Sequence, residues 1–234
     1  LHEESRHLTS FVTPLGAYRY RRMPFGLATA AACFQRVMLH VLKDIPKVLV
    51  FQDDVLVSGE NRDEHDAILM RVLGRMEEAR LTVREDKCKF RVSSVTYLGH
   101  TITKEGISPK FELARSITEA PQPQNKDQVR SFLGLAEYCA RFIQNVAEIS
   151  APLRSLLKKG EKVVWSQEYV QAVAKIKDCT SIMPTLGHFD TCKKTYLSTD
   201  ASLLGLGAGL SQMVDGEEKI VAFASRSVRG AEER

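Results

Sequence analysis

Two adjacent carboxylates, Asp53 and Asp54, are the residues of this chain best suited to chemistry. They lie between two short apolar runs, Val48 to Phe51 and Val55 to Val57. Runs of this length and β-branched content, separated by so few residues, predict a hairpin with the acids at or beside its turn. Two carboxylates held together repel each other unless a cation lies between them, and a two-metal phosphoryl-transfer site requires such a pair. The alternative is a solvated Asp-Asp turn.

The predicted elements around Asp53 and Asp54 would hold the pair in place. Apolar residues at helical spacing predict one helix from about Thr29 to Leu42. A second amphipathic helix is predicted to end near Ala79, with Asn61 as its N-cap. Because its apolar stripe needs a partner surface, we expect this helix to pack behind the sheet of the hairpin.

The first 22 residues have a mostly extended pattern. Tyr18 to Arg21 alternates aromatic and basic residues, so a strand there would place rings on one face and charges on the other. Arg19, Arg21 and Arg22 could then lie near template or nucleotide phosphates. The alternative is an amphipathic strand whose basic face is solvated.

Three further segments place the Asp-Asp pair in a longer pattern. Met23-Pro24-Phe25-Gly26-Leu27 and Cys33-Phe34-Gln35 precede it, and Tyr97-Leu98-Gly99-His100 follows it. In this order, the segments resemble the motifs of a reverse transcriptase of the Ty3/gypsy retrotransposon type. Phe51-Gln52-Asp53-Asp54 stands where that family carries its aromatic-x-Asp-Asp polymerase motif. The resemblance runs from Leu1 to about Ser227.

This resemblance implies a polymerase site with specific contacts. Asp53 and Asp54 would be catalytic ligands of Mg²⁺ (or Mn²⁺), and the partners would be an RNA/DNA template-primer and deoxynucleoside triphosphates. Nucleotide and template contacts would fall to Phe25, Gly26, Gln35, Phe51, Gln52 and Lys87, and primer contacts to Tyr97, Leu98, Gly99 and His100. From the residues alone, Lys87 is equally a basic loop tip, and Tyr97 to His100 an edge hairpin with a glycine turn.

Turn-forming residues open the second half of the chain. Ile107-Ser108-Pro109 and Ala120-Pro121-Gln122-Pro123 are expected to mark a domain change. The strongest helical pattern follows, from Asn125 as N-cap to Ile143. A partner helix is predicted from Ile149 to Lys159. By resemblance these helices would form the thumb, which tracks the nucleic-acid duplex.

Strands are predicted again after a short helical segment from Gln167 to Ile176, which Trp165 introduces. Residues from Thr195 onward predict a β-meander with an Asp215-Gly216 turn. Gly205, Gly207 and Gly209 lie inside this strand pattern and no helix follows at the required place, which excludes a dinucleotide-binding loop. Thr199-Asp200-Ala201-Ser202 resembles the opening of a retroelement RNase H domain, in which Asp200 would be the first catalytic metal ligand.

The expected fold class is α+β. A partial polymerase palm with a three- or four-stranded antiparallel sheet plus helices (residues 1–107) would precede a helical thumb (108–160). A connecting region (161–188) and an incomplete RNase H-like β-meander (189–234) would follow. The resembled family carries a third palm Asp upstream, but no Asp lies between Leu1 and Pro24. Further RNase H acids are expected beyond Arg234, so we expect a piece of a longer polyprotein.

Composition narrows the functional classes. The net charge of +4 is compatible with nucleic-acid binding, and 44% hydrophobic residues are ordinary for a globular protein. Five cysteines without a C-x-x-C pair argue against a disulfide framework or a zinc site. No apolar run approaches the ~20 residues of a membrane span. The resemblance implies an intracellular protein, either cytoplasmic in a virus-like particle or nuclear.

The predicted function is that of an RNA-directed DNA polymerase fragment from a retrotransposon Pol protein, with the start of an RNase H domain. Two of the three expected palm carboxylates are present, so we expect little polymerase activity from these residues alone. The alternative is a non-catalytic nucleic-acid-binding remnant of a decayed or domesticated element. An unrelated metal hydrolase would need a histidine or carboxylate cluster around Asp53 and Asp54, which the sequence does not show.

Overall fold

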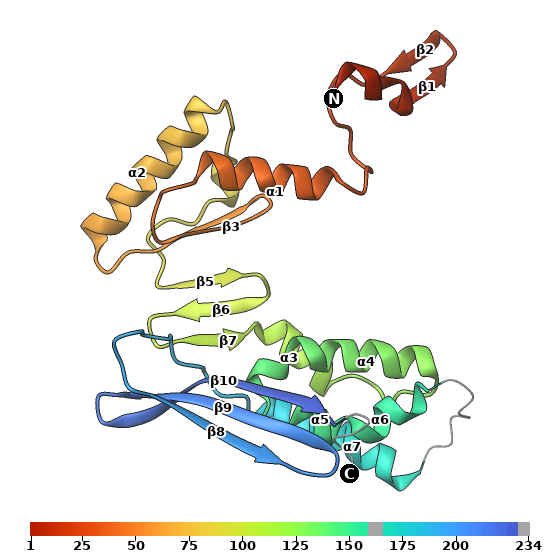
Figure 1. Cartoon of the computed structure of the whole chain (residues 1–234), viewed down its shortest axis with the longest axis vertical. Helices are drawn as coiled ribbons and strands as arrows, with labels where there is room; N and C mark the ends of the chain where they lie inside the picture. The colour runs from red at the N-terminus through yellow and green to blue at the C-terminus, as the bar shows by residue number, and fades with distance from the viewer. Residues whose placement is uncertain (159–165, 229–234) are drawn as a thin grey trace. The chain divides into compact units, whose positions relative to one another are not determined.

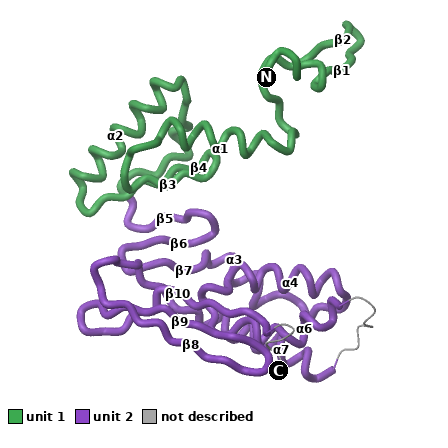
Figure 2. Tube along the Cα trace, in the orientation of Figure 1, with its two compact units in different colours: residues 1–91 green, residues 92–234 purple. Residues whose placement is uncertain are grey.

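A computed structural model describes residues 1–158 and 166–228 of the chain (Figure 1). The chain forms two compact units, residues 1–91 and 92–234 (Figure 2). Both contain helices and strictly antiparallel strand pairs, so the predicted α+β class is confirmed. No helix in the described ranges is long and apolar enough to cross a membrane.

The N-terminal segment of the first unit is only partly extended. A 3₁₀ helix, η1 (Glu3–Thr9), precedes the strands β1 (Ser10–Thr13) and β2 (Gly16–Arg19), which pair with each other. The predicted extended pattern was therefore wrong over η1. The side chains of Thr9 and Ser10 donate hydrogen bonds to carbonyls three residues earlier, which supports the helical turn in place of a strand.

The core of the first unit is built by two helices and one hairpin. These are α1 (Ala30–Val41), α2 (Arg62–Glu78), β3 (Val48–Phe51) and β4 (Asp54–Val57). Buried side chains from α1 and α2 pack against the inner face of the hairpin: Met38, Ile68, Val72 and Met76 contact the partly buried Val50 and Val55 of β3 and β4. The predicted packing of α2 behind the hairpin is confirmed. Asn61 caps α2 as predicted, because its side chain accepts a hydrogen bond from the Glu64 amide at 2.9 Å.

The hairpin does not belong to a larger sheet in the described part of the chain. β3 and β4 pair only with each other, so the predicted three- or four-stranded palm sheet was wrong for these residues. On the outer face, Leu49 and Phe51 are 58% and 46% exposed. The strands of this region form separate small sheets, which the sequence did not indicate because each apolar run predicts a strand without specifying which other strands it pairs with.

A three-stranded sheet begins the second unit. It consists of β5 (Ser94–Tyr97), β6 (His100–Thr103) and β7 (Ile107–Pro109), in that order. The predicted strand pair around Gly99 is confirmed. Ile107–Pro109 was expected to separate domains, but it forms β7, since Ile107 and Ser108 pair with β6 before the chain turns into a helix. The two compact units meet between Arg91 and Val92.

Six short to medium elements follow, and they contain most of the buried apolar residues. They are α3 (Phe111–Thr118), α4 (Lys126–Tyr138), η3 (Ala140–Phe142), α5 (Val146–Ile149), α6 (Ala151–Leu156) and α7 (Gln167–Ser181). Asn125 caps α4 as predicted, accepting from the Gln128 amide at 2.9 Å. Buried residues of α3, α4, α6 and α7 form a single cluster.

Two helix predictions in this region had wrong bounds. The helix expected up to Ile143 ends at Tyr138 and gives way to η3. The helix expected from Ile149 to Lys159 is divided between α5 and α6, where Ser150 separates them and Pro152 lies in the first turn of α6. Proline is favoured in a first turn because it has no amide hydrogen to donate. Lys159 and Trp165 lie outside the described residues.

The C-terminal meander is confirmed as a three-stranded sheet. β8 (Thr195–Ala201), β9 (Gly205–Val214) and β10 (Glu217–Ser227) pair in the order β10-β9-β8, and Asp215-Gly216 turns between the last two. The three glycines lie inside β9 as predicted. In Figure 1, α5 lies against this sheet, and the Ala147 amide donates to the Ser225 hydroxyl of β10 at 3.0 Å.

Candidate functional site

The Asp-Asp pair occupies the turn of the β3–β4 hairpin. Gln52 and Asp53 form the two-residue loop, and Phe51 pairs with Asp54 across it. Both carboxylates belong to exposed residues, and neither makes an ion pair or a side-chain hydrogen bond among the described residues. The predicted hairpin is therefore confirmed, with the acids at its tip. Two unpaired oxygen ligands at one exposed tip are a suitable part of a Mg²⁺ site.

Gln35 reaches this turn from α1. Its Nε2 donates to the Val50 carbonyl at 3.0 Å, and its Oε1 accepts from the Gln52 amide. Gln52 has a φ of +52°, a left-handed conformation that residues other than glycine seldom adopt. One side chain thus contacts the backbone on both sides of Phe51, at the end of β3 and the start of the turn.

An ion-paired lysine fastens the other end of the hairpin to α2. Lys47 Nζ lies 2.8 Å from Glu60 Oε1 and 2.6 Å from Glu64 Oε1. The Ser58 amide also donates to the Lys47 carbonyl at 3.0 Å. Hydrogen bonding to Lys47 lowers the pKa of Glu64. The base of the hairpin is therefore held by charges, whereas its tip is held by an amide.

The remaining residues predicted for the nucleotide site are not joined to the turn by any contact in the described ranges. Phe25 is fully exposed, and Gly26 has a φ of +89° in the turn before α1, with open space where a Cβ would lie. Lys87 ends the 3₁₀ helix η2 (Glu85–Lys87), and its side chain makes no hydrogen bond or ion pair there. Gln35, Phe51, Gln52, Asp53 and Asp54 are the predicted residues that the fold brings together.

The predicted primer contact is the β5–β6 turn. Leu98 and Gly99 form its loop with φ values of +47° and +70°. The Tyr138 hydroxyl of α4 donates to the Leu98 carbonyl, and the Lys110 amide donates to the Gly99 carbonyl at 3.0 Å. A Cβ on Gly99 would lie 2.5 Å from the Tyr138 hydroxyl oxygen. Glycine is therefore required here both for its φ and for the close approach of α4.

His100 completes this packed turn. Its ring centroid lies 5.5 Å from those of both Tyr138 and Phe142, and its buried Nδ1 has no hydrogen-bond partner among the described residues. Burial and the nearby Arg141 charge lower the pKa of His100. Three of the four predicted primer residues thus contact the helices or their flanking backbone; Tyr97, at the end of β5, pairs with His100. Sequence reasoning gave Tyr138 no role, and its neighbours in sequence provide no signal for one.

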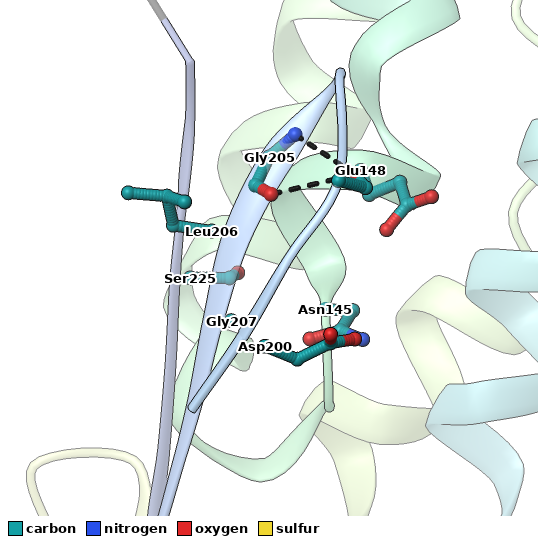
Figure 3. Close-up of a pocket in the computed structure, with 8 residues that line it drawn as sticks. Asn145, Glu148, Asp200, Gly205, Leu206, Gly207 and Ser225 are labelled. Carbon is teal, nitrogen blue, oxygen red and sulfur yellow. Dashed lines mark hydrogen bonds between the residues drawn. The ribbon is translucent and has the colours of Figure 1, made fainter. Parts of the chain in front are cut away.

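Asp200 lies on β8 in a pocket at one end of the C-terminal sheet (Figure 3). Figure 3 shows Asp200 and Asn145 at one end of this pocket and Glu148 at the other. Asn145 has a φ of +52°, and its Oδ1 lies 2.0 Å from the position that a Cβ on Gly207 would take. Gly207 is therefore needed for Asn145 to approach β9. Sequence reasoning missed Asn145 and Glu148, which belong to a different predicted domain.

The acids identified so far occur in pairs at most. No group of three or more His, Cys, Asp or Glu side chains suited to a metal ion exists within residues 1–158 and 166–228. The described acids can therefore supply only part of a metal coordination sphere at either place.

Two known protein families match the segments of the chain that contain the Asp-Asp pair and Asp200. Residues 1–102 match the family described as "Reverse transcriptase (RNA-dependent DNA polymerase)". Residues 165–234 match an "RNase H-like domain found in reverse transcriptase". The class is therefore that of a retroelement polymerase segment followed by an RNase H-like segment.

Two relatives give the family more narrowly. The chain is 38% identical over 233 residues to the Retrovirus-related Pol polyprotein from transposon 297 of Drosophila melanogaster, covering 98% of this chain and 22% of that protein. It is 35% identical over 214 residues to the Transposon Tf2-3 polyprotein of Schizosaccharomyces pombe, covering 91% and 16%. The chain carries reverse transcriptase and RNase H-like segments similar to those of Ty3/gypsy-type retrotransposon Pol polyproteins, and it spans about a sixth to a fifth of the length of these curated relatives.

Solved structures give the same assignment. The foamy viral protease-reverse transcriptase in complex with dsDNA matches with a TM-score of 0.85 and 26% identity, over 100% of this chain and 49% of that one. The same protein in complex with an RNA/DNA hybrid matches with a TM-score of 0.83 and 26% identity, over 100% and 32%. These are similarities of this chain to that enzyme.

Proposed function

We propose that this chain is the part of a retrotransposon reverse transcriptase that supplies two of its polymerase carboxylates, Asp53 and Asp54. The observation that carries the proposal is the hairpin tip with two exposed, unpaired acids, within residues 1–102 that match the reverse transcriptase family. The reaction is RNA-directed DNA synthesis. Its substrates are a template-primer and deoxynucleoside triphosphates.

The donor set at the tip suits Mg²⁺ or Mn²⁺, because both carboxylates offer hard oxygen ligands and neither is committed to a cation of the protein. When bound, the metal would lower the pKa of the primer 3′-hydroxyl and neutralise charge on the leaving pyrophosphate. The chain's own residues hold the tip: Gln35 at the turn and Lys47 at the base of the hairpin. A third carboxylate is expected from upstream sequence.

The nucleic-acid partner follows from charge and from the solved relatives. Foamy viral protease-reverse transcriptase has been solved with dsDNA and with an RNA/DNA hybrid, and the present chain carries a net charge of +4. Arg19, Arg21 and Arg22 are exposed and suited to phosphates. We expect binding of a labelled primer-template to weaken log-linearly with salt, since phosphate contacts release counterions. Binding that ignores salt would count against this partner.

Asp200 is proposed as the first metal ligand of the RNase H-like segment. It lines its pocket together with Glu148, and it lies within the matched residues 165–234. Further acids from beyond this chain would be needed to complete that site. Cleavage of the RNA strand in an RNA/DNA hybrid by a C-terminally extended chain, and its loss in Asp200→Asn, would test this role.

The polymerase assignment is tested by primer extension with Mg²⁺ or Mn²⁺. Three proteins are compared: this chain, a form extended upstream in its reading frame, and the extended form with Asp53→Asn. We expect extension only from the second protein, because in-line positioning of the reacting groups supplies much of the rate and needs the full ligand set.

Asp215→Asn is the matched control, because Asp215 is also an exposed turn acid and its φ of +54° suits asparagine. This variant should extend primers like the parent. Unchanged activity in Asp53→Asn would show that the hairpin is not the metal site. Robust extension by the 234-residue chain alone would show that the third ligand has been misplaced.

A further inference from the structure

We infer that Gln35 is a positioning residue, which fixes the direction of the Asp-Asp turn and makes no essential contact with the nucleotide. The inference rests on the proposed polymerase function, and it differs from the role that family resemblance implies for Gln35 in the nucleotide pocket. The evidence is the pair of hydrogen bonds from one carboxamide to the hairpin backbone.

The carboxamide of Gln35 is engaged at both ends. Nε2 donates to the Val50 carbonyl at 3.0 Å and Oε1 accepts from the Gln52 amide, so the group spans the last part of β3 and the start of the turn. The side chain is only partly exposed. A nucleotide contact would have to compete with hydrogen bonds that the fold already provides.

The helix that carries Gln35 is itself fixed. Met38 lies one helical turn further along α1 and is 2% exposed in the core that also contains Val50 and Val55 of the hairpin. The same core anchors α1 and the inner face of the hairpin. The position of the Gln35 carboxamide relative to the turn is therefore fixed by this packing. Through its two hydrogen bonds, Gln35 thus couples the conformation of the hairpin tip to the packing of the core.

Gln35 binds a residue whose backbone conformation is unfavourable for side chains other than glycine. Gln52 holds a φ of +52° without being glycine, and its amide has the Gln35 oxygen as its acceptor. Asp53 follows it directly, and Asp54 is paired with Phe51 on the other side. Rotation of the Gln52 backbone would redirect Asp53 relative to Asp54, so the Gln35 hydrogen bonds set how the two carboxylates are presented.

The first test uses the 234-residue chain and needs no activity. Gln35→Met keeps the length and apolar stem of the side chain but removes both hydrogen bonds. Amide hydrogen exchange should then lose protection at Gln52, while amides of α1 keep theirs. Gln171→Met is the control, because Gln171 is an exposed helical glutamine in α7. Unchanged protection at Gln52 in Gln35→Met would overturn the inference.

The second test uses the upstream-extended form and separates positioning from nucleotide binding. A misdirected ligand pair should lower kcat by about 10- to 100-fold. The KM for the deoxynucleoside triphosphate should change less than about twofold, because no ground-state contact is lost. Adding Gln52→Gly should restore much of kcat, since glycine adopts a positive φ without support. A raised KM with kcat unchanged would show that Gln35 binds nucleotide.

The two tests keep the inference apart from the function on which it rests. If the parent form extends no primer, the proposed function fails, whereas the exchange result still decides whether Gln35 controls the turn. If the parent is active and Gln35→Met retains its kcat, the positioning role fails and the polymerase assignment stands.

Discussion

Two of the hairpin turns in this protein, β3–β4 and β5–β6, use the same backbone conformation for opposite purposes. In β3–β4, Gln52 has a φ of +52°; in β5–β6, Leu98 has a φ of +47°. A helix side chain, Gln35 or Tyr138, contacts the turn backbone in each case. The first turn leaves the carboxylates of Asp53 and Asp54 exposed, whereas the second packs the His100 ring against Tyr138 although Leu98 stays exposed.

This difference shows how a turn is supported when its side chains must remain available. Gln35 binds only main-chain atoms, which leaves Asp53 and Asp54 unpaired. At the second turn, aromatic rings pack against the His100 side chain, and the Lys110 amide donates a hydrogen bond to the Gly99 carbonyl. We therefore expect substitutions at the first turn to change chemistry with little effect on stability, and substitutions at the second to change stability first.

Removal of an acid from the first turn should give the largest effect. Asp54→Asn in the upstream-extended form should reduce primer extension by about 100-fold or more, because a metal ligand is lost. The free energy of unfolding should stay the same, since the Asp54 side chain is exposed and makes no hydrogen bond in the described part of the chain. Urea unfolding of the variant measures the second quantity. A large loss of stability would mean that the acid is structural.

Adding a side chain at Gly99 in the second turn should mainly reduce the stability of the fold. Gly99→Ala places a methyl group 2.5 Å from the Tyr138 hydroxyl and strains a φ of +70°. We expect a loss of about 2–4 kcal/mol in the free energy of unfolding, measured in urea. Gly74→Ala, inside α2 with open space around it, should instead gain about 0.5–1 kcal/mol. Equal effects of the two variants would remove the distinction.

The hydroxyl of Tyr138 should contribute a smaller amount. Tyr138→Phe keeps the ring beside His100 but leaves the Leu98 carbonyl without its donor. The expected loss is about 1 kcal/mol in the free energy of unfolding. Tyr196→Phe is the control. Tyr196 lies on β8, its ring faces the Lys194 ammonium group, and its hydroxyl makes no hydrogen bond in the residues described. A null result for Tyr138→Phe would assign the contact to the ring alone.

Lowering the pH should give the smallest of these effects, a loss of stability in β5–β6 relative to β3–β4. Burial lowers the pKa of His100 below its ordinary value of 6.5. The folded state thus binds the proton less readily than the unfolded state, and its stability falls as the pH drops below 6.5 toward the folded pKa. Amide exchange should quicken in β5–β6 relative to β3–β4 over this interval. His100→Phe should abolish the difference, and its persistence in that variant would exclude His100 as the cause.

Local features of the sequence determined many of the elements correctly. Asn61 and Asn125 predict the starts of their helices, because an N-cap side chain accepts a hydrogen bond from an amide only three residues away in the sequence. The β3–β4 hairpin was predictable from two apolar runs around the acids. The prediction failed where long-range pairing decided the outcome, as for β3 and β4, which pair only with each other in the described part of the chain.

The sequence by itself determined which residues could do chemistry: the Asp-Asp pair, Asp200 and the ordered motifs that place them in a polymerase family. Only the tertiary structure decided what holds them. Gln35 and Gln52 are 17 residues apart in the chain, and Tyr138 and Leu98 are 40 apart. No local pattern specifies such pairs, because each depends on the packing of a helix against a hairpin through a shared core.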